Sequence, residues 1–223
     1  MESHWEDDRR VEGEIGKFMD KFFYSKLADR CGIKAERVYE RELQLSGVDL
    51  YLTNSHGAKC AMDEKAASHY INSKLGTFAF EVLSRDSNIG WLVNGELKTD
   101  VYSIMWVEAD DKKYPVVDSG ATNYYHSLNM NDIRKVECLW IEKKKVLGYL
   151  KEKGYDSENL YKRALFIKEK GWTGKVDTYP TRSNDFWFYS TSNLAERPIN
   201  VQIKKEVLLE LAHSRYCVTR EGF

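Results

Sequence analysis

Three residues of this chain have types and spacing suited to hydrolytic chemistry: Asp49, Asp63 and Lys65. Successive side chains of a strand point to opposite faces, so Asp63 and Lys65 in the stretch MDEK project from one face, about 6.6 Å apart along the strand. Glu64 points to the other face. If the extended segment that carries Asp49 pairs beside this strand, two carboxylates and one ammonium group share a small volume.

Two carboxylates that lie close together repel each other, which raises the pKa of one of them unless a cation neutralises the pair. Mg²⁺ prefers oxygen ligands and is commonly held by one or two carboxylates together with waters and substrate phosphate oxygens. Such an ion would polarise a scissile phosphate and lower the pKa of a bound water, while Lys65 could orient that water and stabilise developing negative charge. We therefore predict a Mg²⁺ or Mn²⁺ site at Asp49 and Asp63.

The elements that must position these residues can be inferred from the apolar pattern. Between residues 11 and 27 the apolar side chains follow one face of a helix, which Gly32 ends. Residues 37–45 and 47–52 then have the pattern of extended segments, and Asp49 alternates with aliphatic neighbours and so faces away from them. The stretch CAMDEKAA is predicted to be a central strand that ends in charge.

The rest of the chain is predicted to combine strands and helices. Asn94-Gly95 suits a type I′ turn between two strand-like runs, so a β-hairpin is expected there. The segment 172–190 interleaves aromatic rings with Lys175 and Arg182, and both core packing of a β segment and a stacking platform for bases are open. The other expected elements are a strand at 77–84, helices at 132–153 and 158–170, and a closing strand and helix between residues 199 and 213.

In this order of a helix, an acid on an extended stretch, and a strand bearing acid-x-Lys, the chain resembles the PD-(D/E)xK, or restriction-endonuclease-like, nuclease superfamily. The resemblance covers roughly residues 9–85. The matching residues are Gly47, Val48 and Asp49, with valine where the family has proline, and Asp63, Glu64 and Lys65. The resemblance implies an α/β fold with a restriction-endonuclease-like mixed β-sheet core flanked by helices, followed by C-terminal helical and β additions.

The function that the resemblance implies is that of a Mg²⁺-dependent deoxyribonuclease. Asp49 and Asp63 would bind the metal ion, and Lys65 would position the attacking water. The preceding helix often contributes a glutamate in this family; Glu12 is favoured because it borders the inward stripe of the helix, and Glu14 is the alternative. The competing interpretation of the motif is a solvated strand terminus with an ordinary surface ion pair.

Length and composition favour one globular domain. The chain has 223 residues, of which 42% are hydrophobic and 31% charged. We expect a single nuclease-like domain over residues 1–223, with a motif-bearing core at about 9–110 and a C-terminal elaboration at about 130–223. No stretch approaches the roughly 18 apolar residues of a membrane helix, and the start lacks a signal-peptide pattern, so a cytoplasmic protein is expected. The four widely spaced cysteines predict reduced, mostly buried thiols.

Charge patterning predicts where a polyanion would bind. The formal net charge is only −1, but residues 134–175 hold 12 Lys or Arg against 6 Asp or Glu. This excess fits one phosphate-facing side, so DNA contacts are expected there, including Lys143, Lys144 and Lys145. Two other functions stay open: a nucleic-acid-binding or interaction protein that has lost catalysis, and a metal hydrolase of small phosphate esters. A homodimer is open as well.

Overall fold

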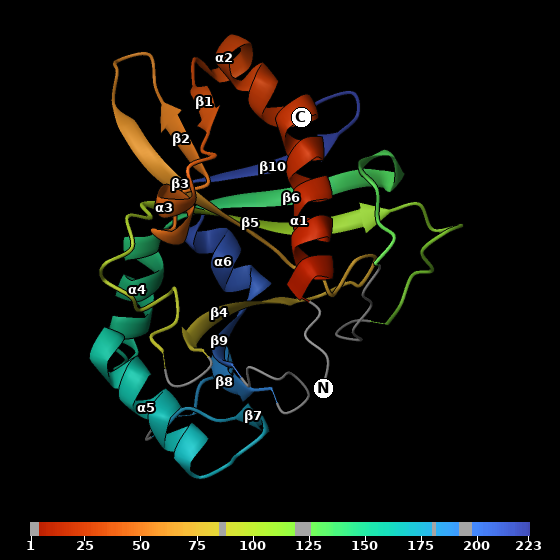
Figure 1. Cartoon of the computed structure of the whole chain (residues 1–223). Helices are drawn as coiled ribbons and strands as arrows, with labels where there is room; N and C mark the ends of the chain where they lie inside the picture. The colour runs from red at the N-terminus through yellow and green to blue at the C-terminus, as the bar shows by residue number, and fades with distance from the viewer. Residues whose placement is uncertain (1–4, 85–87, 119–125, 180–181, 192–197) are drawn as a thin grey trace. The chain divides into compact units, whose positions relative to one another are not determined.

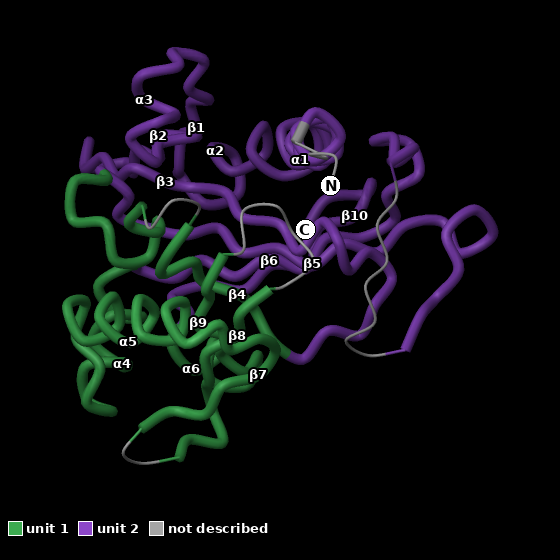
Figure 2. Tube along the Cα trace, turned by 60° about the horizontal axis from the view of Figure 1, so that its bottom comes forward, with its two compact units in different colours: residues 1–3, 77–97, 143–211 green, residues 4–76, 98–142, 212–223 purple. Residues whose placement is uncertain are grey.

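The computed structural model describes residues 5–84, 88–118, 126–179, 182–191 and 198–223. By its internal contacts the chain divides into two compact units (Figure 2). The two are unit 1, with residues 77–97 and 143–211, and unit 2, with residues 4–76, 98–142 and 212–223. This division does not decide whether the chain folds as one domain, and the expected single domain stays a prediction.

Unit 2 is built on a six-stranded mixed sheet (Figure 1). Neighbouring strands are antiparallel except β3 and β5, which run parallel. The strands, in their order across the sheet, are β1 (Lys34–Arg37), β2 (Leu50–Thr53), β3 (Lys59–Ala66), β5 (Val101–Ala109), β6 (Ile133–Glu142) and β10 (Ser214–Thr219). β3, which carries Asp63 and Lys65, is therefore an inner strand with a partner on each side.

A helical layer packs on one face of this sheet (Figure 1). It consists of α1 (Trp5–Met19), a π-helical turn η1 (Asp20–Tyr24) and α2 (Ser25–Cys31). Gly32 ends it in a left-handed conformation with φ 64°. Val11 and Phe18 are fully buried in the same cluster as Met62 of β3, and burial of side chains of this size contributes about 1.5–3 kcal/mol each. The helix predicted between residues 11 and 27 is thus confirmed and extends beyond both ends.

In its described residues, unit 1 contains a four-stranded antiparallel sheet and three helices. In their order across the sheet the strands are β4 (Thr77–Leu83), β9 (Ile199–Lys204), β8 (Phe186–Ser190) and β7 (Gly174–Val176). The helices are α4 (Lys143–Glu152), α5 (Ser157–Glu169) and α6 (Lys205–Leu211). Phe186 and Phe188 are buried, so these rings pack in a core. The strand at 77–84, the helix at 158–170, and the closing strand and helix are confirmed.

The helix predicted at 132–153 is wrong in its first half, because residues 133–142 form β6 and the helix begins only at Lys143. β6 lies between β5 and β10, and residues 138–141 are all buried. A short continuous apolar run of this kind does not separate a buried strand from a buried helix by its periodicity. Part of the predicted basic helical surface is therefore a central strand.

The hairpin predicted around Asn94 is also wrong. The N–H of Gly90 donates to the carbonyl of Val82 (2.9 Å), and a Cβ on this glycine would lie within 2.5 Å of the Glu81 backbone, so the segment is pressed against β4. The side chain of Asn94 stabilises a local turn, because its Oδ1 accepts a hydrogen bond from the N–H of Glu96 (2.9 Å). β5 pairs with β3 and β6 instead.

Near Asp49 the strands are shorter than predicted. In the segment 37–45 the strand ends at Arg37, and α3 (Arg41–Leu45) occupies the second half. β2 begins at Leu50, so Asp49 immediately precedes the strand. Its N–H nevertheless donates to the carbonyl of Met62 (2.8 Å) in β3, which continues the pairing by one residue.

Two expectations drawn from composition can be compared with the structure. All four cysteines are free thiols, but only Cys138 is buried; Cys60 is half-buried, and Cys31 and Cys217 are exposed. Mostly buried thiols were therefore a wrong prediction, since Cys217 lies on the edge strand β10. In the described part of the chain no helix is long and apolar enough to cross a membrane.

Candidate active site

The register of β2 and β3 brings the two predicted acids together in unit 2. Leu50 pairs with Met62 in this antiparallel pair. Continuing by one residue in each direction sets Asp49 opposite Asp63, and residues directly opposite have Cβ atoms about 4.5–5.5 Å apart. Like charges in that relation are destabilising. The pair therefore opposes folding unless something else neutralises it.

Lys65 contributes part of that neutralisation. Its Nζ lies 2.7 Å from Oδ1 of Asp63, and the Asp63 side chain is only 4% exposed while that of Lys65 is 31% exposed. Between them, the N–H of Glu64 donates to Oδ2 of Asp49 (2.8 Å). Three consecutive residues of β3 thus supply a carboxylate, a backbone donor that orients Asp49, and an ammonium group.

The Asp63 carboxyl is held in an unfavourable environment. Burial, followed by the negative charge of Asp49, raises the pKa of Asp63 to about 7, although the ammonium group of Lys65 acts in the opposite direction. Its Oδ2 is buried and has no hydrogen-bond donor within the described residues. An unsatisfied buried polar atom costs about 1–3 kcal/mol, and more when it is charged. This oxygen requires a proton or a cation beside it.

Lys65 is a permanent cation in this arrangement. Burial lowers its pKa, but the negative charges of Asp63, Asp49 and Glu12 outweigh burial, and the pKa of Lys65 lies above its ordinary value. An ammonium group donates hydrogen bonds and has no lone pair with which to remove a proton. Its chemistry is therefore charge stabilisation and orientation of a neighbouring oxygen.

The structure distinguishes the two candidate glutamates of α1 by their surroundings. Partial desolvation raises the pKa of Glu12, and the charges of Lys65 and Asp49 also act on it, the first lowering and the second raising it. Glu14 is engaged elsewhere, since it contacts Lys17 (2.5 Å) and accepts from the N–H of Met130 (2.8 Å). The structure brings Glu12, and not Glu14, into the electrostatic environment of the acidic pair.

The donor set can be compared with the needs of metal ions. Within the described ranges no group of three or more His, Cys, Asp or Glu side chains has the geometry of a metal site. Mg²⁺ commonly takes only one or two protein carboxylates and completes its shell with waters and substrate oxygens. Asp49 with the unpaired Oδ2 of Asp63 fits that smaller requirement. Hard oxygen donors of this kind suit Mg²⁺ or Mn²⁺ better than softer metals.

No protein-family model, curated protein or solved structure matches this chain.

Glu64 and its partners form a network that sequence reasoning missed. As predicted, Glu64 points away from Asp63, and it accepts hydrogen bonds from the Tyr24 hydroxyl (2.7 Å) and from Nη1 of Arg37 (2.7 Å). Arg37 also binds the carboxylate of Asp20 (2.7 Å) in η1. These partners lie 27 and 40 residues from Glu64, so no local pattern pairs them. The network ties β3 to the helical layer from the face opposite the acidic pair.

Tyr102 is a second residue that the sequence did not single out. The parallel pairing of β3 and β5 aligns it with Asp63, and its side chain is fully buried. Burial and then the negative charge of Asp63 raise the pKa of Tyr102 well above its ordinary value. The phenol is therefore neutral at physiological pH and retains its proton as a donor. Only the register of two strands distant in sequence reveals this alignment.

The predicted DNA contact at Lys143 is wrong. Its side chain is almost fully buried, and its Nζ donates to the carbonyl of Asn94 (2.8 Å). Lys144 and Lys145 are exposed and stay candidates. On β6, Lys135 is paired with an acid at 2.5 Å. The basic excess counted in the sequence is thus partly used within the protein.

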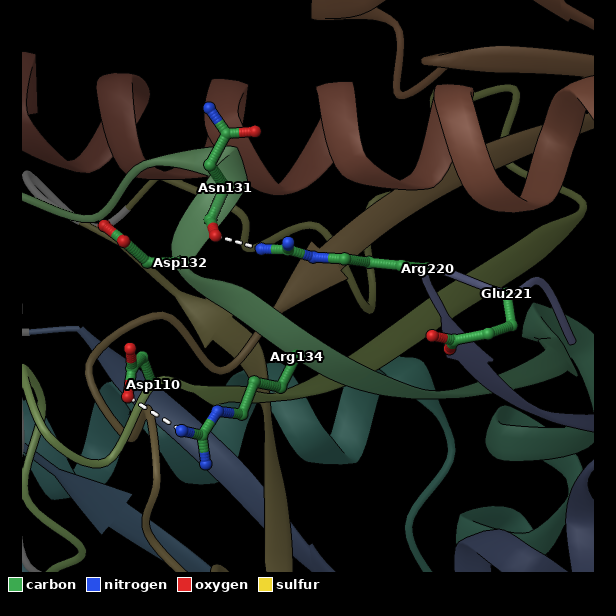
Figure 3. Close-up of a pocket in the computed structure, with 6 residues that line it drawn as sticks. All are labelled: Asp110, Asn131, Asp132, Arg134, Arg220 and Glu221. Carbon is green, nitrogen blue, oxygen red and sulfur yellow. Dashed lines mark hydrogen bonds and ion pairs between the residues drawn. The ribbon is translucent and has the colours of Figure 1, made fainter.

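A surface pocket of ≈ 440 Å³ in unit 2 contains none of the predicted site residues (Figure 3). It is lined by Asp110, Asn131, Asp132, Arg134, Arg220 and Glu221. Its two arginines are engaged: Arg134 contacts Asp110 at 2.8 Å, and Arg220 donates to the carbonyl of Asn131. With three acids and two already engaged arginines, this lining does not favour an anion.

Proposed function

We propose that this protein is a metal-dependent nuclease of the PD-(D/E)xK type that hydrolyses phosphodiester bonds in DNA, with its centre at Asp49, Asp63 and Lys65. The observation that carries the proposal is the buried Oδ2 of Asp63, which lacks a donor among the described residues and belongs to a carboxyl directly opposite Asp49. Such strain costs stability, and ionisable groups perturbed in this way cluster at functional sites.

The order of elements supports the same assignment. α1, which carries Glu12, precedes β2 and β3 in the chain; Asp49 immediately precedes β2, and Asp63 and Lys65 lie on β3 within a mixed sheet that packs against helices. We accordingly propose a restriction-endonuclease-like fold for unit 2. The valine at position 48, where the family has proline, is fully buried and helps to fix the backbone just before Asp49.

Each residue of the centre has a distinct task in this proposal. Asp49 and Asp63 would hold Mg²⁺ or Mn²⁺, which when bound supplies charge stabilisation at the phosphate and a more acidic water. The backbone N–H of Glu64 fixes the Asp49 carboxylate through one oxygen. Lys65 orients the attacking water and stabilises negative charge that develops on the phosphate, since its ammonium group stays protonated. Glu12 lies on α1, and its charge acts on that of Lys65.

A hydrolase of small phosphate esters is the second candidate, because a formal net charge of −1 gives the whole chain little attraction for a polyanion. The dependence of binding on salt concentration distinguishes the two candidates. Contacts to polymer phosphates release counterions, so DNA binding weakens steeply as salt increases, whereas binding of a small ester responds much less.

The direct test is incubation of the purified protein with linear and with circular DNA in the presence of Mg²⁺, Mn²⁺ or EDTA, beside a small phosphate diester. The proposal expects metal-dependent cleavage of DNA that EDTA abolishes. Cleavage of the small ester alone would support the second candidate. Absence of any hydrolysis would favour a structural ion pair between Lys65 and Asp63.

A further inference from the structure

The sheet face that carries the acidic pair also carries a row of cations. Lys34 of β1 pairs with Thr53 of β2, which pairs with Lys59 of β3. Lys59 precedes Asp63 by four residues, an even number, so both side chains project from the same face of β3. At roughly 3.3 Å per residue, the two positions lie about 13 Å apart along the strand. The cation row thus has a fixed spacing from the acidic pair.

Lys59 is exposed, but its side chain is restrained. Its Nζ lies 3.7 Å from the centroid of the Tyr51 ring, in a cation–π contact worth about 0.5–1 kcal/mol at an exposed site. The ring is half-buried and packs against the small buried cluster of Val38, Val48 and Ala61. Lys34, by contrast, lies 2.6 Å from Glu36, whose carboxylate offsets its charge. Lys59 is therefore the cation of this row that can meet an anion with the smaller loss of side-chain freedom.

The outer end of the β2–β3 hairpin is exposed and open to a binding partner. Pairing of β3 with β5 begins only at Met62, so Lys59 pairs with β2 alone. The connection, residues 54–58, is exposed and is braced by Asn54, whose Oδ1 accepts from two backbone N–H groups (3.0 and 2.9 Å). Figure 1 shows this connection standing clear of β5 and β6. A two-stranded ribbon of this kind fits into the major groove of DNA.

We propose that Lys59, held by Tyr51, binds a backbone phosphate of the DNA strand that is cut at the acidic pair. This proposal rests on the proposed nuclease function and names a further contact to the DNA that is cut at the same site. One strand of duplex DNA advances about 3.4 Å along the axis per nucleotide. Because about 13 Å is several times this rise, Lys59 would contact a phosphate other than the scissile one. Since the acidic pair repels DNA in the absence of metal, such a contact supplies attraction that the centre itself lacks.

The test compares affinity for a fluorescent DNA duplex across a range of salt concentrations, in EDTA so that no cutting occurs. We expect Lys59→Gln to make the negative slope of log affinity against log salt less steep by about 0.9, which at 0.1 M salt corresponds to roughly tenfold weaker binding. Tyr51→Leu, which removes the ring, should weaken binding in the same direction. The matched control is Lys21→Gln, since Lys21 is also exposed and rests on an aromatic ring, 5.2 Å from the centroid of Phe22, but belongs to the helical layer on the other face.

Each outcome bears on the proposal separately from the nuclease assignment. If the unaltered protein cuts DNA and Lys59→Gln keeps its affinity and slope, Lys59 is only a lysine resting on a tyrosine, and the nuclease assignment stands. An equal loss in Lys21→Gln would show a general charge effect and would also overturn the proposal. If the unaltered protein neither binds nor cuts DNA, both proposals fall. Circular dichroism melting of each variant establishes that the substitutions leave the fold intact.

Discussion

Replacement of Asp63 by asparagine should stabilise this protein at alkaline pH while destroying its proposed activity. Asparagine keeps the volume and hydrogen-bonding shape of a protonated aspartate but removes the charge that opposes Asp49. Because the Asp63 side chain is only 4% exposed, solvent screens this repulsion poorly. The substitution therefore removes a cost to folding at the same position where we propose a metal ligand.

The size of the effect follows from the pKa of Asp63, which the fold raises from its ordinary value of 3.8 to about 7. Between these two values the folded protein binds more protons than the unfolded chain, so stability falls as pH rises through this window and does not recover above it. At 1.36 kcal/mol for each pH unit, the loss amounts to roughly 4 kcal/mol at pH 8. We expect Asp63→Asn to be more stable than the unaltered protein by about 2–4 kcal/mol at pH 8 and to be similar to it at pH 4.

The assay is urea unfolding at pH 4, 6 and 8, in EDTA, followed by circular dichroism. Asp29→Asn serves as the control, since Asp29 is an exposed residue of α2 and its substitution should change stability by less than about 0.5 kcal/mol. Adding Mg²⁺ at pH 8 should stabilise the unaltered protein and leave Asp63→Asn unchanged, because only a site with both carboxylates binds the ion. The reasoning is refuted if Asp63→Asn is no more stable than the unaltered protein at pH 8, or if both lose stability equally between pH 4 and pH 8.

Three further predictions concern the other residues. Lys65→Gln should lower Mg²⁺-dependent DNA cleavage by about a hundredfold or more, since removal of one charge-stabilising group costs about that much, and should also lower stability at pH 8, because Asp63 loses the cation that offsets Asp49; full activity would remove Lys65 from the centre. Calorimetry should show weaker Mn²⁺ binding to Asp49→Asn than to the unaltered protein, and unchanged affinity would move the metal site elsewhere. Replacing Lys144 and Lys145 by glutamine, with Lys143 left in place because it is buried, should flatten the salt slope of DNA binding by about 0.9 for each phosphate that is no longer bound; an unchanged slope makes them a solvated helix face.

The acidic centre was accessible from the sequence because it depends on local rules. Alternation along one strand is enough to set Asp63 and Lys65 on one face and Glu64 on the other, and the structure has this arrangement. The approach of Asp49 needed one additional assumption, that its segment pairs beside β3, and the antiparallel register supplies it. What strand alternation alone determines was thus predictable.

What depends on distant partners was not. The sequence of β6 has the pattern of a helix, and only its pairing with β5 and β10, which lie elsewhere in the chain, makes it a strand. The alignment of Tyr102 with Asp63 requires the parallel register of two strands separated by a long insertion. The burial of Lys143 depends on a carbonyl 49 residues away. In each case the deciding contact is tertiary, and a local pattern of residue types does not contain it.

The central claim is that the opposed carboxylates Asp49 and Asp63 form a metal-dependent nuclease centre. Its most direct test is the single-turnover rate of DNA cleavage in Mg²⁺ by the unaltered protein, by Asp63→Asn and by the control Asp29→Asn. The account predicts that cleavage requires the metal, that Asp63→Asn loses about a hundredfold or more of the rate, and that Asp29→Asn retains it. Metal-dependent cleavage by Asp63→Asn at the rate of the unaltered protein, or no cleavage by the unaltered protein, would contradict it.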